Sequence, residues 1–242
     1  MLRVHGVAED DTQHAKICKD YKEGVTCVGW KNERKLIEFD NRDNTASTRN
    51  SGGSSSSSSS TDRVVEVRDG DPLQHRRKVL EVKRIVDNEL GFAISGRQCH
   101  DESNNSHVDE KEGDLLSGLT SYLYISKKRV VGLLLVKRIQ RAYEVVVEND
   151  NNKKHYDPVS SSFSISRSLK STRALLGIHQ IWVHSSHRKK GIASKLVNAA
   201  RDHLIFGMII PVELIAFSSP TDEGLQFAKR YVGLERPLVY DI

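Results

Sequence analysis

The stretch IHQIWVHSSHRKKGIASKLVNAAR, residues 178–201, indicates the fold more strongly than any other part of the chain. Its first six residues, 178–183, are mainly β-branched or aromatic with short polar interruptions, and such a run predicts a strand. Two serines and a basic cluster end this pattern before Gly191. From Ile192 onward the apolar residues recur at helical spacing, so we expect a helix directly behind the turn.

A strand, a basic turn and a helix start in this order form an expected anion site. The first backbone N–H groups of a helix have no partner within it, and the helix dipole places partial positive charge there. A glycine in the turn lets a ligand approach the backbone closely. The sequence has neither the GxxxxGK[ST] of a P-loop nor the GxGxxG of a dinucleotide fold. The alternative is a solvated basic turn. The residues expected to bind a diphosphate are Arg188, Lys189, Lys190, Gly191, Ile192, Ala193 and Ser194.

The segment RKKGIA, residues 188–193, resembles the R/Q-x-x-G-x-G/A phosphate loop of the GCN5-related N-acetyltransferases. The IWV before it, the segment 214–233 and the closing PLVY are similar to the C-terminal core of the Eco/ESCO family of sister-chromatid cohesion acetyltransferases. Far upstream, GWKNERK at 29–35 resembles the segment that follows the small zinc finger of that family. The resemblance implies an α/β fold of the GCN5-related N-acetyltransferase type, with a mixed, mostly antiparallel sheet flanked by helices.

Composition limits the class of protein. The chain has 242 residues, enough for one sizeable core with insertions or for two small domains. No apolar run approaches the ~20 residues that span a membrane, and no secretory signal is visible. Three widely spaced cysteines do not suggest a disulfide framework, so we expect a reducing compartment. The net charge of +5 comes with scattered basic clusters, which would suit work on chromatin.

The first 23 residues are polar and are interpreted as a truncated or decayed zinc-finger remnant before an acetyltransferase domain at 24–242. His14 and Cys18 have the spacing of the last two ligands of a finger, but no CxxC pair precedes them. By the resemblance, these two residues are the candidate metal ligands. A structural zinc site needs four, so zinc binding by this chain is doubtful, and the alternative is a frayed polar helix.

Periodicity predicts the remaining elements. The helices are expected at 74–90, where Gly91 signals the C-terminal end, and at 221–231. A strand or hairpin anchored by Trp30 is expected at 25–39. The other expected strands are 64–67, 119–125, 129–137, 142–147, 175–183, 214–218 and 237–240. Flexible insertions are expected near 40–62, 93–118 and 148–173, because these stretches are polar and poor in apolar residues.

The resemblance also implies where acetyl-CoA binds. In the superfamily, the strand before the phosphate loop splays from its neighbour, and the pantetheine amides pair with the backbone groups that this gap leaves. These groups correspond to Ile181, Trp182 and Val183. The start of the following helix, Thr221, Asp222 and Glu223, is assigned to the same cofactor site.

Acetyl transfer to lysine requires a neutral amine, an oxyanion donor and a proton for the leaving thiolate. Tyr231 matches the tyrosine that commonly protonates the thiolate. Animal members of the family have Ser, Glu and Asp where this sequence has His179, Asn198 and Ser219, so no carboxylate remains at these positions. We hypothesise that His179 is the general base, since an unperturbed histidine pKa of about 6.5 suits proton acceptance near neutrality. The alternatives are ordered water without a dedicated base and a catalytically impaired chain.

The function that the resemblance implies is acetyl-CoA-dependent acetylation of lysine on the ATPase-head subunit of cohesin, in the nucleus, in contact with chromatin and the replication machinery. The oligomeric state stays open, and no membrane partner is expected. One alternative is an N-acetyltransferase for another protein or an amine. The other is a non-catalytic or impaired chromatin-binding relative, which the three changed polar positions favour.

Overall fold

The computed structural model describes residues 8–39, 62–91, 115–146 and 166–241. The chain forms two compact units. The first comprises residues 1–135 with 182–199, and the second comprises 136–181 with 200–242. The predicted division into a finger remnant at 1–23 and an acetyltransferase domain at 24–242 stays a prediction.

The sheet of the first unit is antiparallel. Its strands lie in the order β2-β3-β4-β5, and the short strand β1 pairs with β5. The strands are β1 (Val25–Thr26), β2 (Arg34–Phe39), β3 (Asp62–Val67), β4 (Thr120–Ser126) and β5 (Arg129–Arg138). The predicted strand at 64–67 therefore pairs back onto the segment that follows GWKNER, and the two predicted strands at 119–137 form a hairpin, as expected.

The turn between β4 and β5 consists of two lysines in the left-handed region. Lys127 has a φ of 48° and Lys128 a φ of 63°. Positive φ at both central residues is the geometry of a two-residue type I′ turn, whose twist matches that of the strands. Asn and Gly are preferred in such turns because other residues are strained there. The hairpin is thus held by its strands against the local preference of its turn residues.

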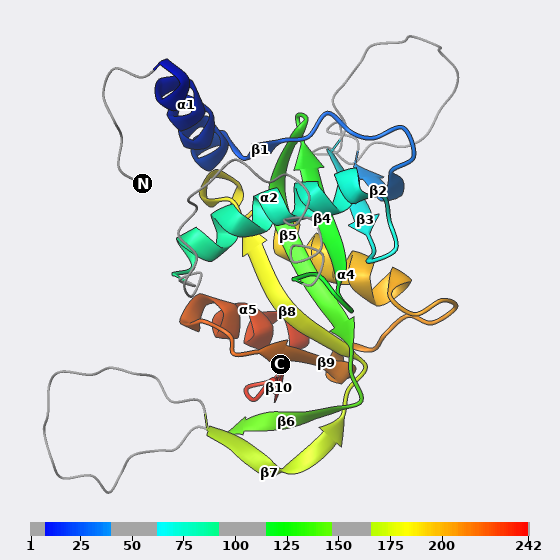
Figure 1. Cartoon of the computed structure of the whole chain (residues 1–242). Coiled ribbons are helices and arrows are strands. Elements are labelled where there is room, and N and C mark those ends of the chain that lie inside the picture. The colour runs from blue at the N-terminus through cyan, green and yellow to red at the C-terminus, as the bar shows by residue number, and fades with distance from the viewer. Residues whose placement is uncertain (1–7, 40–61, 92–114, 147–165, 242) are drawn as a thin grey trace, which may run out of the picture. The chain divides into compact units, whose positions relative to one another are not determined.

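Helix α2 (Leu73–Glu89) packs on one face of this sheet. It presents an apolar stripe, Val79, Val82 and Val86, that is fully buried. This stripe lies in one core cluster with Val65, Val67, Leu123, Ile125, Leu133, Leu135 and Trp182. On the opposite face, a Cβ added at Gly132 would lie 3.0 Å from Ile192 and Leu196 of helix α4 (Ile192–His203). A helix therefore covers each face of the sheet (Figure 1).

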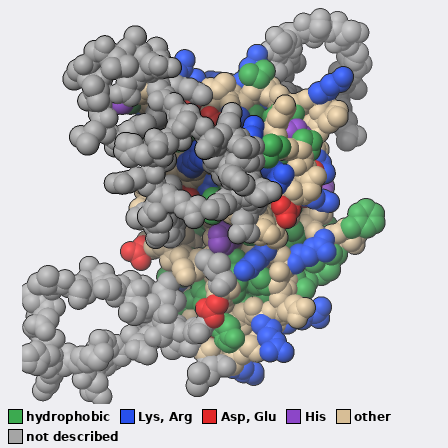
Figure 2. All heavy atoms as spheres, in the orientation of Figure 1, with side chains coloured by type: hydrophobic (Ala, Val, Ile, Leu, Met, Phe, Trp, Pro, Cys, Tyr) green, Lys and Arg blue, Asp and Glu red, His purple; other side chains and the backbone are tan. Residues whose placement is uncertain are grey.

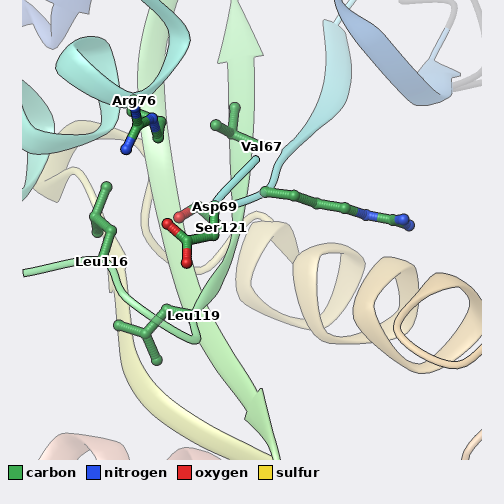
Figure 3. A pocket seen from close by; sticks show the side chains of 7 residues that line it. Val67, Asp69, Arg76, Leu116, Leu119 and Ser121 are labelled. Carbon is green, nitrogen blue, oxygen red and sulfur yellow. The ribbon is translucent and has the colours of Figure 1, made fainter. Parts of the chain in front are cut away.

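Part of the insertion predicted at 93–118 belongs to the core. Leu116 is 3% exposed and joins the apolar cluster under α2, and Leu119 packs against the same cluster. Figure 3 shows both leucines at the edge of a narrow recess, which is lined by Val67, Arg68, Asp69, Arg76, Leu116, Leu119 and Ser121. Residues 115–118 of the predicted flexible insertion form a turn in which Leu116 is buried in the core while the other three residues are exposed. The recess contains none of the residues predicted for cofactor binding or catalysis.

Helix α1 (Ala8–Glu23) precedes the sheet and is connected to β5 by Arg129. The Arg129 guanidinium donates to the carbonyl of Gly24 at 2.6 Å and lies 2.7 Å from Glu23. After α1 in the sequence, Trp30 of GWKNER stacks on His75 of α2, with ring centroids 4.3 Å apart. Trp30 therefore anchors its segment to the core, as predicted.

The second unit has a mixed sheet in the order β8-β9-β10-β6-β7. The β8–β9 and β9–β10 pairs are parallel, and the β10–β6 and β6–β7 pairs are antiparallel. The strands are β6 (Arg141–Val146), β7 (Ser166–Arg173), β8 (Leu176–Val183), β9 (Ile215–Ser218) and β10 (Leu238–Tyr240). Together with the antiparallel first unit, this confirms the predicted fold class of a mixed, mostly antiparallel sheet with flanking helices.

Strand β7 contradicts the insertion predicted at 148–173. Residues 166–173 pair with β6 from Arg141↔Arg173 to Val146↔Ser166, and β7 lies at the end of the strand order. An edge strand exposes unpaired backbone groups along one side, and charged side chains on it discourage pairing with another chain. The sequence SRSLKSTR therefore forms a strand without the apolar alternation on which the prediction relied. The remainder of this insertion lies outside the described residues, as do residues 40–61 of the insertion predicted at 40–62, whose last residue, Asp62, begins β3.

Helix α5 (Asp222–Val232) begins and ends where the sequence predicts. The Thr221 side chain accepts from the backbone N–H of Gly224 at 3.2 Å, which is an N-cap. Gly233 ends the helix with a φ of 75°, the left-handed conformation that glycine adopts without strain. A 3-10 turn, η2 (Val212–Leu214), precedes β9.

The surface carries charge of both signs. In the space-filling view, Lys and Arg side chains are dispersed and acidic side chains lie between them (Figure 2). Among the described residues, no helix is long and apolar enough to span a membrane.

Candidate active site

The predicted anion loop lies in the first unit, between the 3-10 turn η1 (Ser185–His187) and helix α4. Two of its residues have positive φ, 62° at Lys189 and 75° at Gly191. Left-handed residues in such a turn direct successive N–H groups to one side, and this geometry builds anion-binding concavities. The first bond of α4 runs from the N–H of Lys195 to the carbonyl of Gly191 at 3.0 Å. The N–H groups of residues 192–194 precede that bond, so the helix itself offers them no acceptor.

Gly191 is required by its conformation and leaves room on one side of the loop. No heavy atom of the described chain lies within 4 Å of the position that a Cβ would take there. The predicted close approach of a ligand to the backbone is therefore compatible with the observed loop. The φ of 75° is a second reason for a glycine at residue 191, which the motif spacing does not reveal.

Two cationic side chains of the loop, those of Arg188 and Lys190, form hydrogen bonds within the protein. Arg188 donates through Nε to the carbonyl of Val183 at 3.0 Å and through Nη2 to Glu89 at 2.7 Å. Lys190 donates to the carbonyl of Ser186 at 3.0 Å. Lys189 is exposed. The backbone N–H groups, more than the arginine, are thus available to an anion.

His184 connects this loop to helix α1. Its ring is buried, and its Nε2 donates to the carbonyl of Tyr21 at 3.0 Å. Its Nδ1 accepts from the hydroxyl of Ser186 at 2.8 Å, and the same hydroxyl lies 2.9 Å from Nδ1 of His187. Burial, with Lys190 and His184 adding to it, lowers the pKa of His187. No local pattern indicates the contact between His184 and Tyr21, because these two residues are 163 positions apart in the chain.

The ladder between β8 and β9 is shorter than β8 itself. The ladder between β8 and β9 runs only from Leu176↔Ile215 to Ile178↔Phe217, although β8 continues to Val183. The last residue of β9 forms a different contact, since the Ser218 hydroxyl donates to the carbonyl of His179 at 2.8 Å. Among the described strand pairs, β9 therefore does not continue along Ile181, Trp182 and Val183, the residues predicted to pair with pantetheine.

His179, the predicted base, lies on β8 immediately after the end of this ladder. Its side chain is half-buried, and its Nδ1 is shielded from solvent. Its place in the strand is fixed from the β9 side by the bond from Ser218 to its backbone carbonyl. The position agrees with the prediction, and the role in proton transfer stays a hypothesis.

The other two changed positions lie on exposed parts of the chain. Asn198 is exposed on α4, in the first unit, and Ser219 is exposed directly after β9, in the second. Ser219 has a φ of 32°, on the positive side that Asp and Asn tolerate better than serine does. Neither side chain is a Brønsted base at neutral pH, so both are poor candidates for taking a proton.

Tyr231, the predicted acid, is half-buried on α5, where its ring stacks on Phe227 with centroids 5.5 Å apart. Its hydroxyl accepts from Nη1 of Arg201 at 3.4 Å, and Arg201 is held by the carbonyl of Ile210 at 2.7 Å. Burial raises the pKa of Tyr231, and this effect outweighs the opposite influence of Arg201. The hydroxyl therefore keeps its proton at neutral pH, as a proton donor must.

The remaining predicted contacts, at the start of α5, have a structural explanation. Thr221 caps the helix with its hydroxyl. Asp222 and Glu223 lie in the first turn, where acidic side chains are stabilised by the helix dipole. Assignment of these three residues to the cofactor stays a prediction.

The candidate metal ligands lie together on α1. Sγ of Cys18 is 3.7 Å from both ring nitrogens of His14, as their spacing on one helical face predicts. Within the described residues, no group of three or more His, Cys, Asp or Glu side chains is placed to hold a metal ion. Two donors do not fit a structural zinc site, which uses four.

Comparison with known proteins agrees with this geometry. Residues 172–240 match the family model of the ESCO1/2 acetyl-transferase. The chain is 31% identical over 248 residues to the human N-acetyltransferase ESCO1, covering all of this chain and 25% of that protein. It is also 31% identical over 247 residues to human ESCO2, again over all of this chain and 34% of that protein. The chain thus spans a quarter to a third of these relatives.

A solved structure extends the similarity to the fold. The acetyltransferase domain of xEco2, determined bound to a K105-CoA conjugate, has a TM-score of 0.62 and 29% sequence identity to this chain. The match covers 88% of this chain and 99% of that domain. The loop before α4, the end of the β8–β9 ladder and these similarities agree with one another: the chain is similar to the acetyltransferase domain of the Eco/ESCO proteins.

Proposed function

We propose that this chain is an acetyl-CoA-dependent protein lysine N-acetyltransferase that acts on the ATPase-head subunit of cohesin in the nucleus. The observation that carries the proposal is the loop before α4, where left-handed Lys189 and Gly191 precede the N–H groups of a helix start. A protein that only served as a scaffold would have no need of such an anion-binding loop. The match to Eco/ESCO proteins supports the substrate class.

In this proposal each part of acetyl-CoA has its own binding element. The diphosphate lies on the backbone N–H groups of residues 189–194, assisted by the lysine charges. The pantetheine amides pair with backbone groups of Ile181, Trp182 and Val183, because the β8–β9 ladder ends at Ile178. Pairing of this kind would place the thioester along the strand that carries His179.

The chemical step needs proton transfer at two atoms. A free lysine has a pKa of about 10.4, so presenting its neutral amine near pH 7.4 costs about 4 kcal/mol. His179 accepts the amine proton, directly or through water, as the nitrogen attacks the thioester carbon. The carbon–sulfur bond then breaks, and the Tyr231 hydroxyl donates its proton to the departing thiolate. The products are the acetylated lysine and free CoA.

A single-turnover experiment tests this assignment. Wild-type protein with bound acetyl-CoA is mixed with a recombinant cohesin ATPase head, and acetylated lysine is measured by mass spectrometry between pH 6 and pH 9. We expect His179→Ala to lower the rate and to remove the pH dependence due to a histidine base. His203→Ala, a histidine at the end of α4, is the matched control. Unchanged turnover of His179→Ala across this range would exclude His179 as the base.

A second candidate function is that of an impaired, chromatin-binding relative. The observation that favours it is the replacement of the family's carboxylates by exposed Asn198 and Ser219. Acetyl-CoA binding without transfer to the cohesin head would support it. Contacts with chromatin and the replication machinery belong to either proposal.

A further inference from the structure

One acidic side chain outside the predicted site joins two elements of the anion loop. Glu89 is the last residue of α2, and its two carboxylate oxygens have different partners. Oε2 accepts from the indole Nε1 of Trp182 at 2.8 Å, and Oε1 accepts from Nη2 of Arg188 at 2.7 Å. Trp182 belongs to the end of β8, and Arg188 opens the loop. In Figure 1 the C-terminal end of α2 lies beside the tip of the β8 arrow.

The location of Glu89 is unfavourable by local rules. The C-terminal end of a helix carries partial negative charge, so an acidic residue there is destabilising by ordinary helix electrostatics. The last turn of α2 contains no basic residue that would offset it. A residue that violates a local preference is expected to have a tertiary or functional reason. Here the reason is the pair of donors from the loop and strand, 93 and 99 residues away in sequence.

Arg188 is held from two directions by this arrangement. Its Nε bonds the carbonyl of Val183 at 3.0 Å while its Nη2 bonds Glu89. The planar guanidinium therefore links the end of the strand, the start of the loop and the end of α2. Trp182, only 5% exposed, fixes the other carboxylate oxygen from within the core. Between Val183 and Arg188 the backbone makes the turn η1, so both ends of that turn are secured.

We propose that Glu89 is a positioning residue for the diphosphate loop, acting through Arg188 and Trp182. This inference rests on the proposed function, because it concerns the same cofactor site. Glu89 does not touch the ligand. It fixes the start of the loop so that the N–H groups of residues 189–194 are already aligned when the diphosphate arrives, and ordering them then costs no further free energy.

The sign of the change in acetyl-CoA affinity distinguishes a positioning role of Glu89 from simple charge repulsion. A carboxylate near an anion site repels the anion, so removal of its charge should by Coulomb's law strengthen acetyl-CoA binding. Loss of the alignment of the loop's N–H groups should instead weaken acetyl-CoA binding. A charge-assisted hydrogen bond contributes enough to change a dissociation constant about tenfold. We therefore expect Glu89→Gln to weaken acetyl-CoA binding about tenfold, since the isosteric amide cannot accept from both donors at once.

The experiment is isothermal titration of acetyl-CoA and of S-acetylpantetheine, which lacks the diphosphate, into wild-type and variant protein. Glu89→Gln should weaken binding of acetyl-CoA and leave binding of S-acetylpantetheine unchanged. In steady-state kinetics the KM for acetyl-CoA should rise while kcat stays the same. Asp87→Asn is the matched control. It removes one negative charge from the same helical turn, and Asp87 is paired within α2 to Lys83 at 2.7 Å.

Four outcomes decide the matter. Failure of wild-type protein to bind acetyl-CoA would overturn the proposed function itself. Wild-type binding with equal or tighter binding by Glu89→Gln would overturn the positioning role alone. Equal weakening of both ligands by Glu89→Gln would indicate general destabilisation and would also overturn it. Selective loss of acetyl-CoA affinity, absent in Asp87→Asn, supports it. If Glu89→Gln does not fold, Arg188→Lys, which keeps the charge without the planar fork, carries the same expectation.

Discussion

Substitution of Gly191 by alanine separates the conformation of the loop from its use in binding. With a φ of 75°, the residue lies in the left-handed region, where alanine is strained by roughly 1–2 kcal/mol. No steric clash adds to this value, because no heavy atom of the described chain lies within 4 Å of the added methyl. For a chain of this length we expect the melting temperature to fall by about 2–4 °C for each kcal/mol lost.

Acetyl-CoA affinity should fall together with the stability of the Gly191→Ala variant. The methyl group enters the open side of the loop, where the proposed diphosphate approaches the backbone. We expect acetyl-CoA affinity to fall about tenfold or more, because the N–H groups can no longer be approached at hydrogen-bond distance. Gly207 is the matched control, because it has a φ of 74°, has equally open surroundings and follows α4 in the second unit. Gly207→Ala should show the same loss in melting temperature with unchanged affinity.

Thermal denaturation and titration calorimetry on the two variants provide the comparison. Equal loss of acetyl-CoA affinity in Gly191→Ala and Gly207→Ala would mean that stability, rather than the loop, governs binding. Unchanged affinity in Gly191→Ala, accompanied by the expected loss of stability, would refute the argument that the diphosphate lies against this backbone.

Two further predictions concern the hairpin and the acid. Replacing Lys127 and Lys128 by Asn and Gly should raise the free energy of unfolding by about 1–2 kcal/mol in urea titrations, because it relieves two strained residues; no gain would contradict the left-handed turn. Tyr231→Phe should lower the single-turnover rate about a hundredfold with acetyl-CoA affinity unchanged. Burial raises the pKa of Tyr231, so folding favours its protonated form. Loss of rate through ionisation of Tyr231 should therefore appear only above pH ~10. Loss of rate through its ionisation at a lower pH would contradict the assignment of Tyr231 as the proton donor.

The elements that the sequence predicted well are those whose apolar residues are periodic. Helix α2 follows from Val79, Val82 and Val86, which all lie in the core. Helix α5 has both a Thr221 cap and a Gly233 end, so its bounds were predicted to within one residue. The pattern of a strand, a basic turn with Gly191 and a helix start located the predicted anion loop, and the resemblance added its assignment to acetyl-CoA.

The parts that were missed depend on contacts between distant residues. Strand β7 has no apolar alternation, and its pairing with β6 decides its conformation. Leu116 reaches the core from a polar stretch, which composition alone cannot reveal. Glu89 lies in no local pattern other than the helix predicted at 74–90, because its partners Trp182 and Arg188 become neighbours only through folding. Residues that position a site through long-range contacts leave no local pattern.

Titration of acetyl-CoA into the wild-type chain, with S-acetylpantetheine as the comparison ligand, tests whether the loop before α4 binds a diphosphate. We expect saturable binding of one acetyl-CoA per chain and much weaker binding of the ligand without the diphosphate. Absence of acetyl-CoA binding, or equal affinity for the two ligands, would contradict the claim that the loop before α4 binds the diphosphate.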